Sequence, residues 1–215
     1  MKKIFSWMLA AILVCGASVV VSSCGSDDDD TTTPPVVTPN TYEVTLSAVL
    51  PESAAEFFTL DIEYTVADGR TNKATVKAGD ESGEMSEQMK KLYDMEKESA
   101  AIRLQWDNKP EKLALFDKLI IKNYTFNVPA TKSFSYKATI KVRNDYAQPT
   151  GEVFDVIMPF VYLGAKRISG NSQDNSIFTE HLGLTVYGSV ETENIGEYLN
   201  MFNGEVIVEE TRTIN

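Results

Sequence analysis

Residues 58–66 read Phe-Thr-Leu-Asp-Ile-Glu-Tyr-Thr-Val, and this alternation of apolar and polar side chains decides the fold class. Residues 42–48, Tyr-Glu-Val-Thr-Leu-Ser-Ala, show the same pattern. A period of two residues is typical of strands that bury one face and expose the other. The Asp68-Gly69 pair after the first stretch predicts a tight hairpin turn, with a second strand near Lys73–Lys77.

Several later segments show comparable patterns. We expect further strands at Ala101–Trp106, Lys118–Val128, Ser133–Arg143, Val153–Leu163, His181–Val190 and Glu205–Thr213. The segment from Val153 to Leu163 is apolar on both faces except at Asp155, which predicts a central strand. Pro159 inside this segment predicts a bulge or a break, because proline cannot donate a hydrogen bond to a neighbouring strand.

Two segments have helical rather than strand periodicity. Glu84–Lys97 places Met85, Met89 and Leu92 on one stripe, and Thr192–Phe202 has apolar residues at helical spacing before the Asn203-Gly204 stop signal. Both predicted helices are short, and we expect them to cover an open end of the β-core.

These patterns predict a mainly β fold. We expect residues 41–215 to form a single β-rich globular domain, an antiparallel β-sandwich of about eight or nine strands with two short covering helices. A β-barrel of similar strand count is the alternative. Apolar residues make up 43% of the chain, which is ordinary for a globular protein.

The N-terminus has the three-part layout of a secretory signal. Lys2 and Lys3 precede the apolar run Ile4–Val21, and small residues follow before Cys24. About 18 residues is the lower limit for a membrane-spanning helix, so a retained span is the alternative. The serine pair Ser22-Ser23 and other small residues weaken that alternative, and we expect residues 1–23 to be a signal peptide.

The ending Val21-Ser22-Ser23-Cys24 resembles the lipobox of bacterial lipoproteins, with Val21 in place of the usual leucine. The resemblance implies that the Cys24 thiol is acylated and that cleavage leaves Cys24 as the first residue. Lipoproteins of this class carry two or three acyl chains, enough for stable membrane anchoring. The partner implied is therefore a membrane, contacted through an N-terminal lipid.

The acidic run Asp27, Asp28, Asp29 and Asp30 directly follows. It resembles the surface-export signal of lipoproteins from the Bacteroidetes, which implies an outer-membrane location facing the cell exterior. The alternative is a solvated acidic linker that carries no targeting signal. Residues 24–40 as a whole form an acidic, Pro/Thr-rich tether, which we expect to be extended. Asp30-Thr31-Thr32 also resembles the Asp-Thr-Xaa O-glycosylation site of such proteins, implying modification at Thr31.

Charge and cysteine content exclude several classes. Removal of residues 1–23 would take away two of the 20 basic residues and none of the 31 acidic ones, so the net charge of −11 would fall to about −13. A nucleic-acid partner is excluded, since such proteins need the opposite charge. Cys15 and Cys24 are the only cysteines, so the domain has no disulfide and depends on its core alone.

No motif marks a catalytic or metal site. His181 is the only histidine, too few for a usual zinc site, and no Gly-Xaa-Ser-Xaa-Gly elbow accompanies it. Asp80, Glu81 and Glu84 lie near glycines, but the alternating calcium-loop pattern is absent and a solvated loop explains them better. We therefore expect no catalytic residue, no metal and no cofactor.

Aromatic side chains are the remaining candidates for ligand contact. Trp106 alternates with Ile102 and Leu104, which predicts packing in the core. Tyr187 lies on the polar side of its predicted strand and Tyr146 in a loop, so these two are the candidate exposed rings. The polar loop 171–176 is long enough to bind something, but a solvated connection is the simpler reading.

These inferences together favour a non-catalytic surface lipoprotein whose β-domain is a binding or structural module. One version binds glycans as an accessory to polysaccharide uptake. The alternative version is a fimbrial or adhesin-type subunit that contacts another surface protein. A small hydrolase with an unmarked pair of carboxylates is the third and least favoured class.

Overall fold

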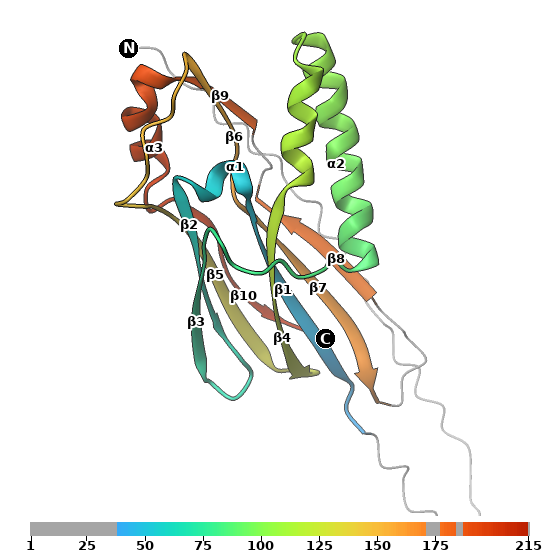
Figure 1. Cartoon of the computed structure of the whole chain (residues 1–215). Helices are drawn as coiled ribbons and strands as arrows, with labels where there is room; N and C mark the ends of the chain where they lie inside the picture. The colour runs from blue at the N-terminus through green and yellow to red at the C-terminus, as the bar shows by residue number, and fades with distance from the viewer. Residues whose placement is uncertain (1–37, 171–176, 184–186, 215) are drawn as a thin grey trace, which may run out of the picture. The chain divides into compact units, whose positions relative to one another are not determined.

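The computed structural model describes residues 38–170, 177–183 and 187–214 (Figure 1). The expectations for Cys24, Asp27–Asp30, Thr31 and the loop 171–176 concern residues outside these ranges. Ten strands lie within them: β1 (Thr41–Pro51), β2 (Phe58–Thr65), β3 (Thr71–Val76), β4 (Leu119–Pro129), β5 (Ser133–Val142), β6 (Val153–Ile157), β7 (Phe160–Ser169), β8 (Ile177–Leu182), β9 (Tyr187–Glu191) and β10 (Val206–Thr213). The helical segments are α1 (Glu52–Ala55), α2 (Glu87–Trp106), η1 (Pro110–Asp117), η2 (Thr192–Asn194) and α3 (Ile195–Phe202).

The strands form antiparallel sheets. The β1 sheet has the order β4-β1-β7-β8, the β2 sheet has the order β10-β5-β2-β3, and β6 pairs with β9. No sheet within the described ranges closes into a barrel. The expected antiparallel β-sandwich is therefore confirmed, with slightly more strands than predicted.

The alternating faces of β1 and β2 build the core between the two large sheets. Val44 and Leu46 from β1 and Leu60 from β2 are fully buried. The partner strand β5 adds another alternating face, with Phe134, Tyr136, Ala138 and Ile140 all buried. These side chains belong to one continuous apolar cluster. Burial of such faces removes apolar surface from water and is the main favourable contribution to folding.

The predicted hairpin between β2 and β3 is confirmed. Thr65 pairs with Thr71 at its end, and Gly69 adopts a φ of 86°. A positive φ is easily reached by glycine because it has no Cβ. The Asp68 carboxylate accepts a hydrogen bond from the Arg70 backbone N–H at 3.0 Å, which holds the turn.

Pro159 breaks the segment 153–163, as expected. β6 ends at Ile157 and pairs with β9, whereas β7 begins at Phe160 and lies between β1 and β8. β7 is the central strand that the apolar run predicted. Its inward side chains join the sandwich core, while Phe160 and Tyr162 on the other face are covered by α2 and η1.

The predicted strand Ala101–Trp106 is wrong, because α2 continues through it to a length of 20 residues. The Ser86 hydroxyl caps the N-terminus by accepting from the Met89 N–H at 3.2 Å. At the other end Asn108 has a φ of 57°, and the Lys109 N–H donates to the Leu104 carbonyl at 2.8 Å. This is the hydrogen-bond pattern of a Schellman motif, with asparagine where glycine is usual.

The predicted core position of Trp106 is also wrong, since its side chain is 82% exposed. Ile102 is 59% exposed, whereas Ala100 and Leu104, four residues apart, are buried. A short apolar alternation fits a strand, but in a helix successive residues rotate by about 100°. Ile102 and Trp106 therefore lie together on the side away from the protein. α2 also covers a face of the β1 sheet and not an open end, contrary to expectation.

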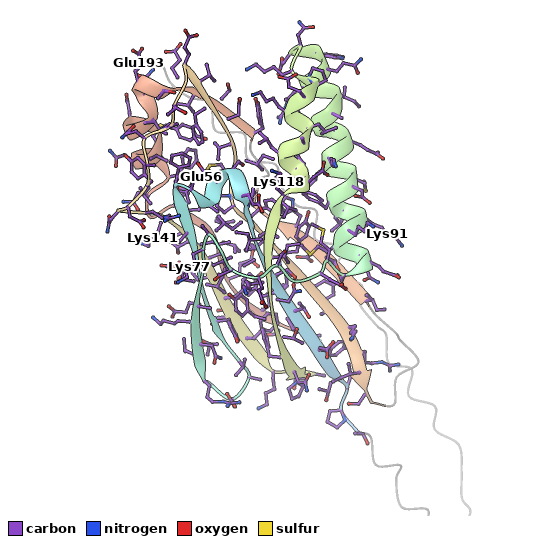
Figure 2. All side chains as sticks on the ribbon, viewed as in Figure 1. Glu56, Lys77, Lys91, Lys118, Lys141 and Glu193 are labelled. Atoms are coloured by element: carbon purple, nitrogen blue, oxygen red, sulfur yellow. The ribbon has the colours of Figure 1, made fainter. Side chains whose placement is uncertain are left out.

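The helices α2 and α3 pack against different parts of the protein. α2 packs with Met89 and Tyr93 onto the outer face of the β1 sheet, in a second apolar cluster with Val49 and Phe160. α3 instead contributes Ile195 and Leu199 to the sandwich core. Figure 2 shows charged side chains over the whole ribbon, among them Lys91 on α2, Lys141 on β5 and Glu193 before α3.

Asp155 is the one polar residue of β6, and its side chain links three elements. Its carboxylate accepts from the Tyr187 hydroxyl at 2.5 Å and pairs with the Lys112 ammonium of η1 at 2.5 Å. The side chain is only 11% exposed. Burial alone would raise the pKa of Asp155, but the hydrogen bonds from Lys112, Tyr187 and Ser189 outweigh it and hold this pKa below its usual value.

Replacing Asp155 by asparagine keeps the shape and removes the charge. At pH 7 we expect the free energy of unfolding to fall by about 1–3 kcal/mol, because Lys112 and Tyr187 lose a buried ionised acceptor. A depressed pKa stabilises the fold above the unfolded value of about 3.9, and this effect is lost as the pH falls through the folded pKa. In urea unfolding, the difference between wild type and variant should be constant above about pH 5 and shrink below about pH 4. A difference that persists unchanged to about pH 3 would contradict this assignment.

Candidate functional site

The outer face of the β1 sheet is divided into a covered half and an open half. Toward Pro51, its side chains are apolar and lie under α2 and η1. Toward Thr41, the outward positions are polar: Glu43, Thr45 and Ser47 on β1, Asn123 and Thr125 on β4, and Lys166 on β7. The open half is therefore a hydrogen-bonding surface that begins where the helical cover stops.

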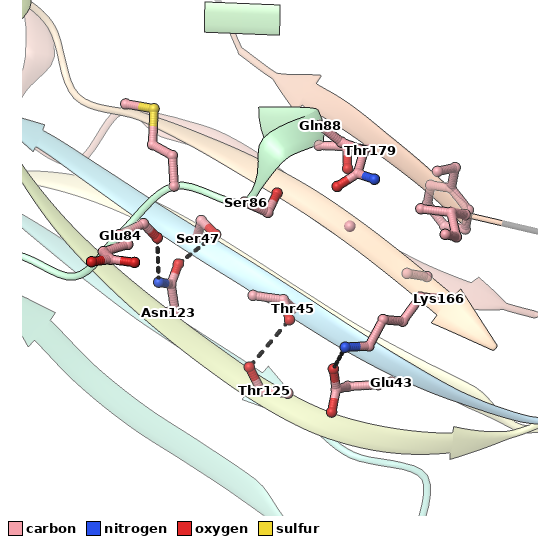
Figure 3. Close-up of a pocket in the computed structure, with 15 residues that line it drawn as sticks. Glu43, Thr45, Ser47, Glu84, Ser86, Gln88, Asn123, Thr125, Lys166 and Thr179 are labelled. Atoms are coloured by element: carbon pink, nitrogen blue, oxygen red, sulfur yellow. Dashed lines mark hydrogen bonds and ion pairs between the residues drawn. The ribbon is translucent and has the colours of Figure 1, made fainter. Parts of the chain in front are cut away.

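This open half forms a groove of about 360 Å³. Its floor is the polar surface just described, and β8 adds Ile177 and Thr179 along one side. The segment that leads into α2, residues 84–88, forms a wall that runs from Glu84, beside Asn123 of β4, to Gln88, beside Thr179 of β8 (Figure 3). A cavity of this size lies at the lower end of the range for small-molecule sites, about 300–1,000 Å³.

A hydrogen-bonded chain joins the wall to the floor. The Ser47 hydroxyl donates to Asn123 Oδ1 at 2.7 Å, and Asn123 Nδ2 donates to the Glu84 carbonyl at 2.9 Å (Figure 3). Ser47 is only 6% exposed. A buried hydroxyl needs its hydrogen-bond partner, so these two hydrogen bonds fix the position of the wall.

Further along the floor the polar groups are also paired. The hydroxyls of Thr45 and Thr125 lie 3.1 Å apart across the β1–β4 pair. Lys166 Nζ contacts Glu43 Oε1 at 2.7 Å, with both side chains partly exposed. The floor thus offers hydroxyl and amide groups together with one balanced ion pair, and Glu84 of the wall adds one negative charge.

Gly164 keeps the floor of the groove open. A Cβ at this position would lie 3.3 Å from the Thr179 hydroxyl on the adjacent strand. Such a contact is tight, so a larger side chain would have to project into the groove. Glycine in the interior of a strand often marks the close approach of another group, and here it leaves space above β7.

A second depression, of about 590 Å³, lies on the outer face of the β2 sheet. Its charged side chains are largely paired on the sheet itself, as in the contacts of Lys73 with Glu63 and of Lys137 with Glu209, each at 2.8 Å. Its lining comes from the sheet strands and the turn before β10 and includes no separate wall. We therefore regard the smaller groove on the β1 sheet as the better candidate site.

His181 lies beside this groove, under α2, and takes part in packing. Its ring stacks on Tyr162 with centroids 4.8 Å apart and meets the Phe160 ring edge-on at 5.4 Å. Its Nδ1 atom contacts the Glu96 carboxylate of α2. Burial, followed by the nearby Glu96 carboxylate, raises the pKa of Tyr162. This cluster secures α2 to the outer face of the sheet.

The two tyrosines predicted as exposed rings are half-buried. Tyr146 packs against Phe57, with centroids 5.8 Å apart. Burial and the hydrogen bond to Asp155 raise the pKa of Tyr187, whose ring packs against the cluster under α2. Neither ring lines the groove. Ligand contact by either tyrosine remains a prediction.

The acidic residues near Gly79 and Gly83 shape the loop before α2. The Asp80 carboxylate accepts from the Lys77 backbone N–H at 3.1 Å, and the Gly83 N–H donates to the Ile121 carbonyl at 2.7 Å. In the parts of the chain that the structure describes, no three His, Cys, Asp or Glu side chains gather as metal ligands would. The loop instead lies against the beginning of β4, near Ile121, and leads to the groove wall.

Sequence reasoning missed the groove. Its residues come from four strands and a loop, and the only signal was that each strand had a polar face. Strand faces that are simply exposed to solvent have the same polar pattern.

No protein-family model, curated protein or solved structure matches this chain. In the described ranges no helix is both long enough and apolar enough to cross a membrane.

Changing Asn123 to alanine tests the link between wall and floor. The variant leaves the buried Ser47 hydroxyl without its acceptor, so we expect a loss of about 1–3 kcal/mol in the free energy of unfolding. Hydrogen exchange should also accelerate in residues 84–88, because the Glu84 carbonyl loses its donor. Thr125 to alanine, one outward position further along β4, is the matched control and should change neither measurement strongly. Equal effects of the two variants would refute this role for Asn123.

Proposed function

We propose that the protein is a non-catalytic, lipid-anchored surface protein whose β-sandwich binds neutral, polyhydroxylated ligands, such as glycans, in the groove on the β1 sheet. The observation that carries this proposal is the lining of the groove. Hydroxyl and amide groups of Thr45, Asn123, Thr125 and Thr179 dominate it, and its single lysine is paired with Glu43.

The charge of the groove favours neutral over anionic ligands. A phosphate or sulfate group would need unpaired cations, whereas Lys166 already contacts Glu43 at 2.7 Å. A sugar needs directional hydrogen bonds and an apolar surface for its ring faces. Ile177, which is 55% exposed, and Met85 supply apolar surface beside the polar floor.

The anchor comes from the N-terminal sequence. The lipobox-like segment ending at Cys24 and the acidic run Asp27–Asp30 support acylation and export to the outer surface. There the domain would meet extracellular polysaccharides, as an accessory to their uptake. An anchored domain also remains near the envelope, where a weakly binding groove is useful because the local concentration of sites is high.

Glycan titration tests the groove. We expect at least one neutral oligosaccharide from a panel of plant and host glycans to bind the purified chain in calorimetry. Thr45 to tyrosine, which fills the floor, should abolish binding. Thr139 to tyrosine on the outer face of the β2 sheet is the matched control and should leave binding intact. No binding by any glycan, or loss only with the Thr139 variant, would overturn the assignment.

The anchor has a separate test. Changing Cys24 to serine removes the thiol that acylation requires. We expect the variant to lose incorporation of labelled palmitate and to leave the membrane fraction, while the wild-type chain stays in it. Export can be read independently by adding protease to intact cells that carry changes at Asp27–Asp30. An unchanged mass and fractionation of the Cys24 variant would refute lipid anchoring.

A fimbrial or adhesin-type subunit is the second candidate. The observation that favours it is the position of β10, which follows α3 as the last strand and pairs with only one neighbour, β5. Such an edge strand is the kind of element that subunits exchange during assembly. β1, in contrast, lies in the interior of its sheet between β4 and β7. Polymers that persist after deletion of residues 206–215 would exclude exchange through β10.

A further inference from the structure

An apolar strip runs along the solvent side of α2. Met95 is 66% exposed, Ile102 59% and Trp106 82%, and Ser99 between them is also exposed. These four residues, the α2 strip, are separated by four, three and four positions, so they share one side of the helix. The side chains that fix α2 to the protein lie on the opposite side, at Met89, Tyr93, Ala100 and Leu104.

We propose that the α2 strip is a self-association surface through which two copies of the chain pair as parallel helices. Its spacing is that of alternating d and a positions in a heptad repeat, the pattern by which helices pack side by side. The strip spans about 16 Å along the helix axis. Ser99 is the small residue that lets the two backbones approach, and Ile102 and Trp106 supply the apolar contact.

The charges beside the strip select both the partner and its direction. Glu98 occupies a g position and Arg103 the following e position, five residues later. In a parallel pair, a g residue faces the following e residue of the other helix, so Glu98 meets Arg103 of the second copy on both sides. In an antiparallel pair, g faces g and e faces e, which brings like charges together.

Glu98 and Arg103 are available for such contacts. Both are exposed, and neither forms an ion pair with any residue in the described ranges. A second copy of the same chain therefore satisfies the apolar strip and the flanking charges at once. This self-complementarity is what a two-fold symmetric interface requires.

The placement of α2 fits a parallel pair. β1 starts at Thr41, beside Pro129, and ends at Pro51, beside Leu119. The hairpin of α2 and η1 joins β4 at this Leu119 end and extends beyond the sheet (Figure 1). A parallel pair directs the Thr41 ends of both copies the same way, so both can face one membrane. This point and the gain in effective concentration described next rest on the proposed anchor.

The strip is short compared with interfaces that hold dimers in dilute solution, which bury about 1,200–2,000 Å². Two copies confined to one surface meet at a higher effective concentration, which strengthens a weak pair. The pairing is therefore to be measured on cells that produce the full chain as well as on the purified protein.

Cysteine cross-linking tests the arrangement directly, because the described residues contain no cysteine and the unmodified chain reports any cross-link through Cys15 or Cys24. In a parallel pair the two copies of an a position are adjacent, so Ser99→Cys should form a cross-linked dimer on oxidation of intact cells. Asp94→Cys, exposed on the same helix but off the strip, is the matched control and should stay monomeric. Equal yields from the two variants, or no dimer from Ser99→Cys, would overturn the proposal.

Charge exchange provides the second test. In the Ser99→Cys background, Glu98→Arg alone and Arg103→Glu alone each place like charges together, and the dimer dissociation constant should rise about tenfold. Mixing these two variants restores both contacts, so mixed dimers should recover the original yield. Cross-linking that ignores both single changes, or a mixture that does not recover, would refute parallel pairing through this strip. Neither test depends on glycan binding.

Discussion

The structure depends on the burial of two alternating strand faces against each other. β1 and β2 each present a row of apolar side chains, and the space between their sheets is filled from both sides by residues such as Leu46 and Leu60. Because side chains alternate across a strand, burial of one face determines which residues form the other. The polar surface available for function is thus set by the same register that builds the core.

The two outer faces then have different environments. The outer face of the β2 sheet is solvated and carries mutually paired charges, such as Lys137 with Glu209. The outer face of the β1 sheet is half covered by α2 and η1, and its second apolar cluster ends where the helix begins. The groove lies at this boundary, where a loop wall held by Asn123 meets the open floor. Partial cover therefore creates a concave site on a sheet that would otherwise be a plain surface.

α2 connects the two proposals made for this chain. Its N-terminal segment forms the wall of the groove, and its buried side is secured by packing and by the contact of Glu96 with His181. The other side of α2 exposes Trp106 and Ile102 to solvent. Ligand binding in the groove and pairing through the strip use separate surfaces of one helix, so either can exist without the other.

The sequence by itself determined the mainly β class, the hairpin at Asp68-Gly69 and the break at Pro159, because each depends on local backbone geometry or on a period of two residues. The proposed acylation of Cys24 likewise rests on a local stretch of sequence. Only the tertiary structure decided that residues 101–106 are helical, since the alternation of Ile102, Leu104 and Trp106 is too short to separate a strand from a helix, and burial of Ala100 and Leu104 resolved it. The groove was equally beyond sequence, because Thr45, Asn123 and Thr179 come together only through strand order. Long-range pairing costs chain entropy that only the completed core repays, so no local pattern records it.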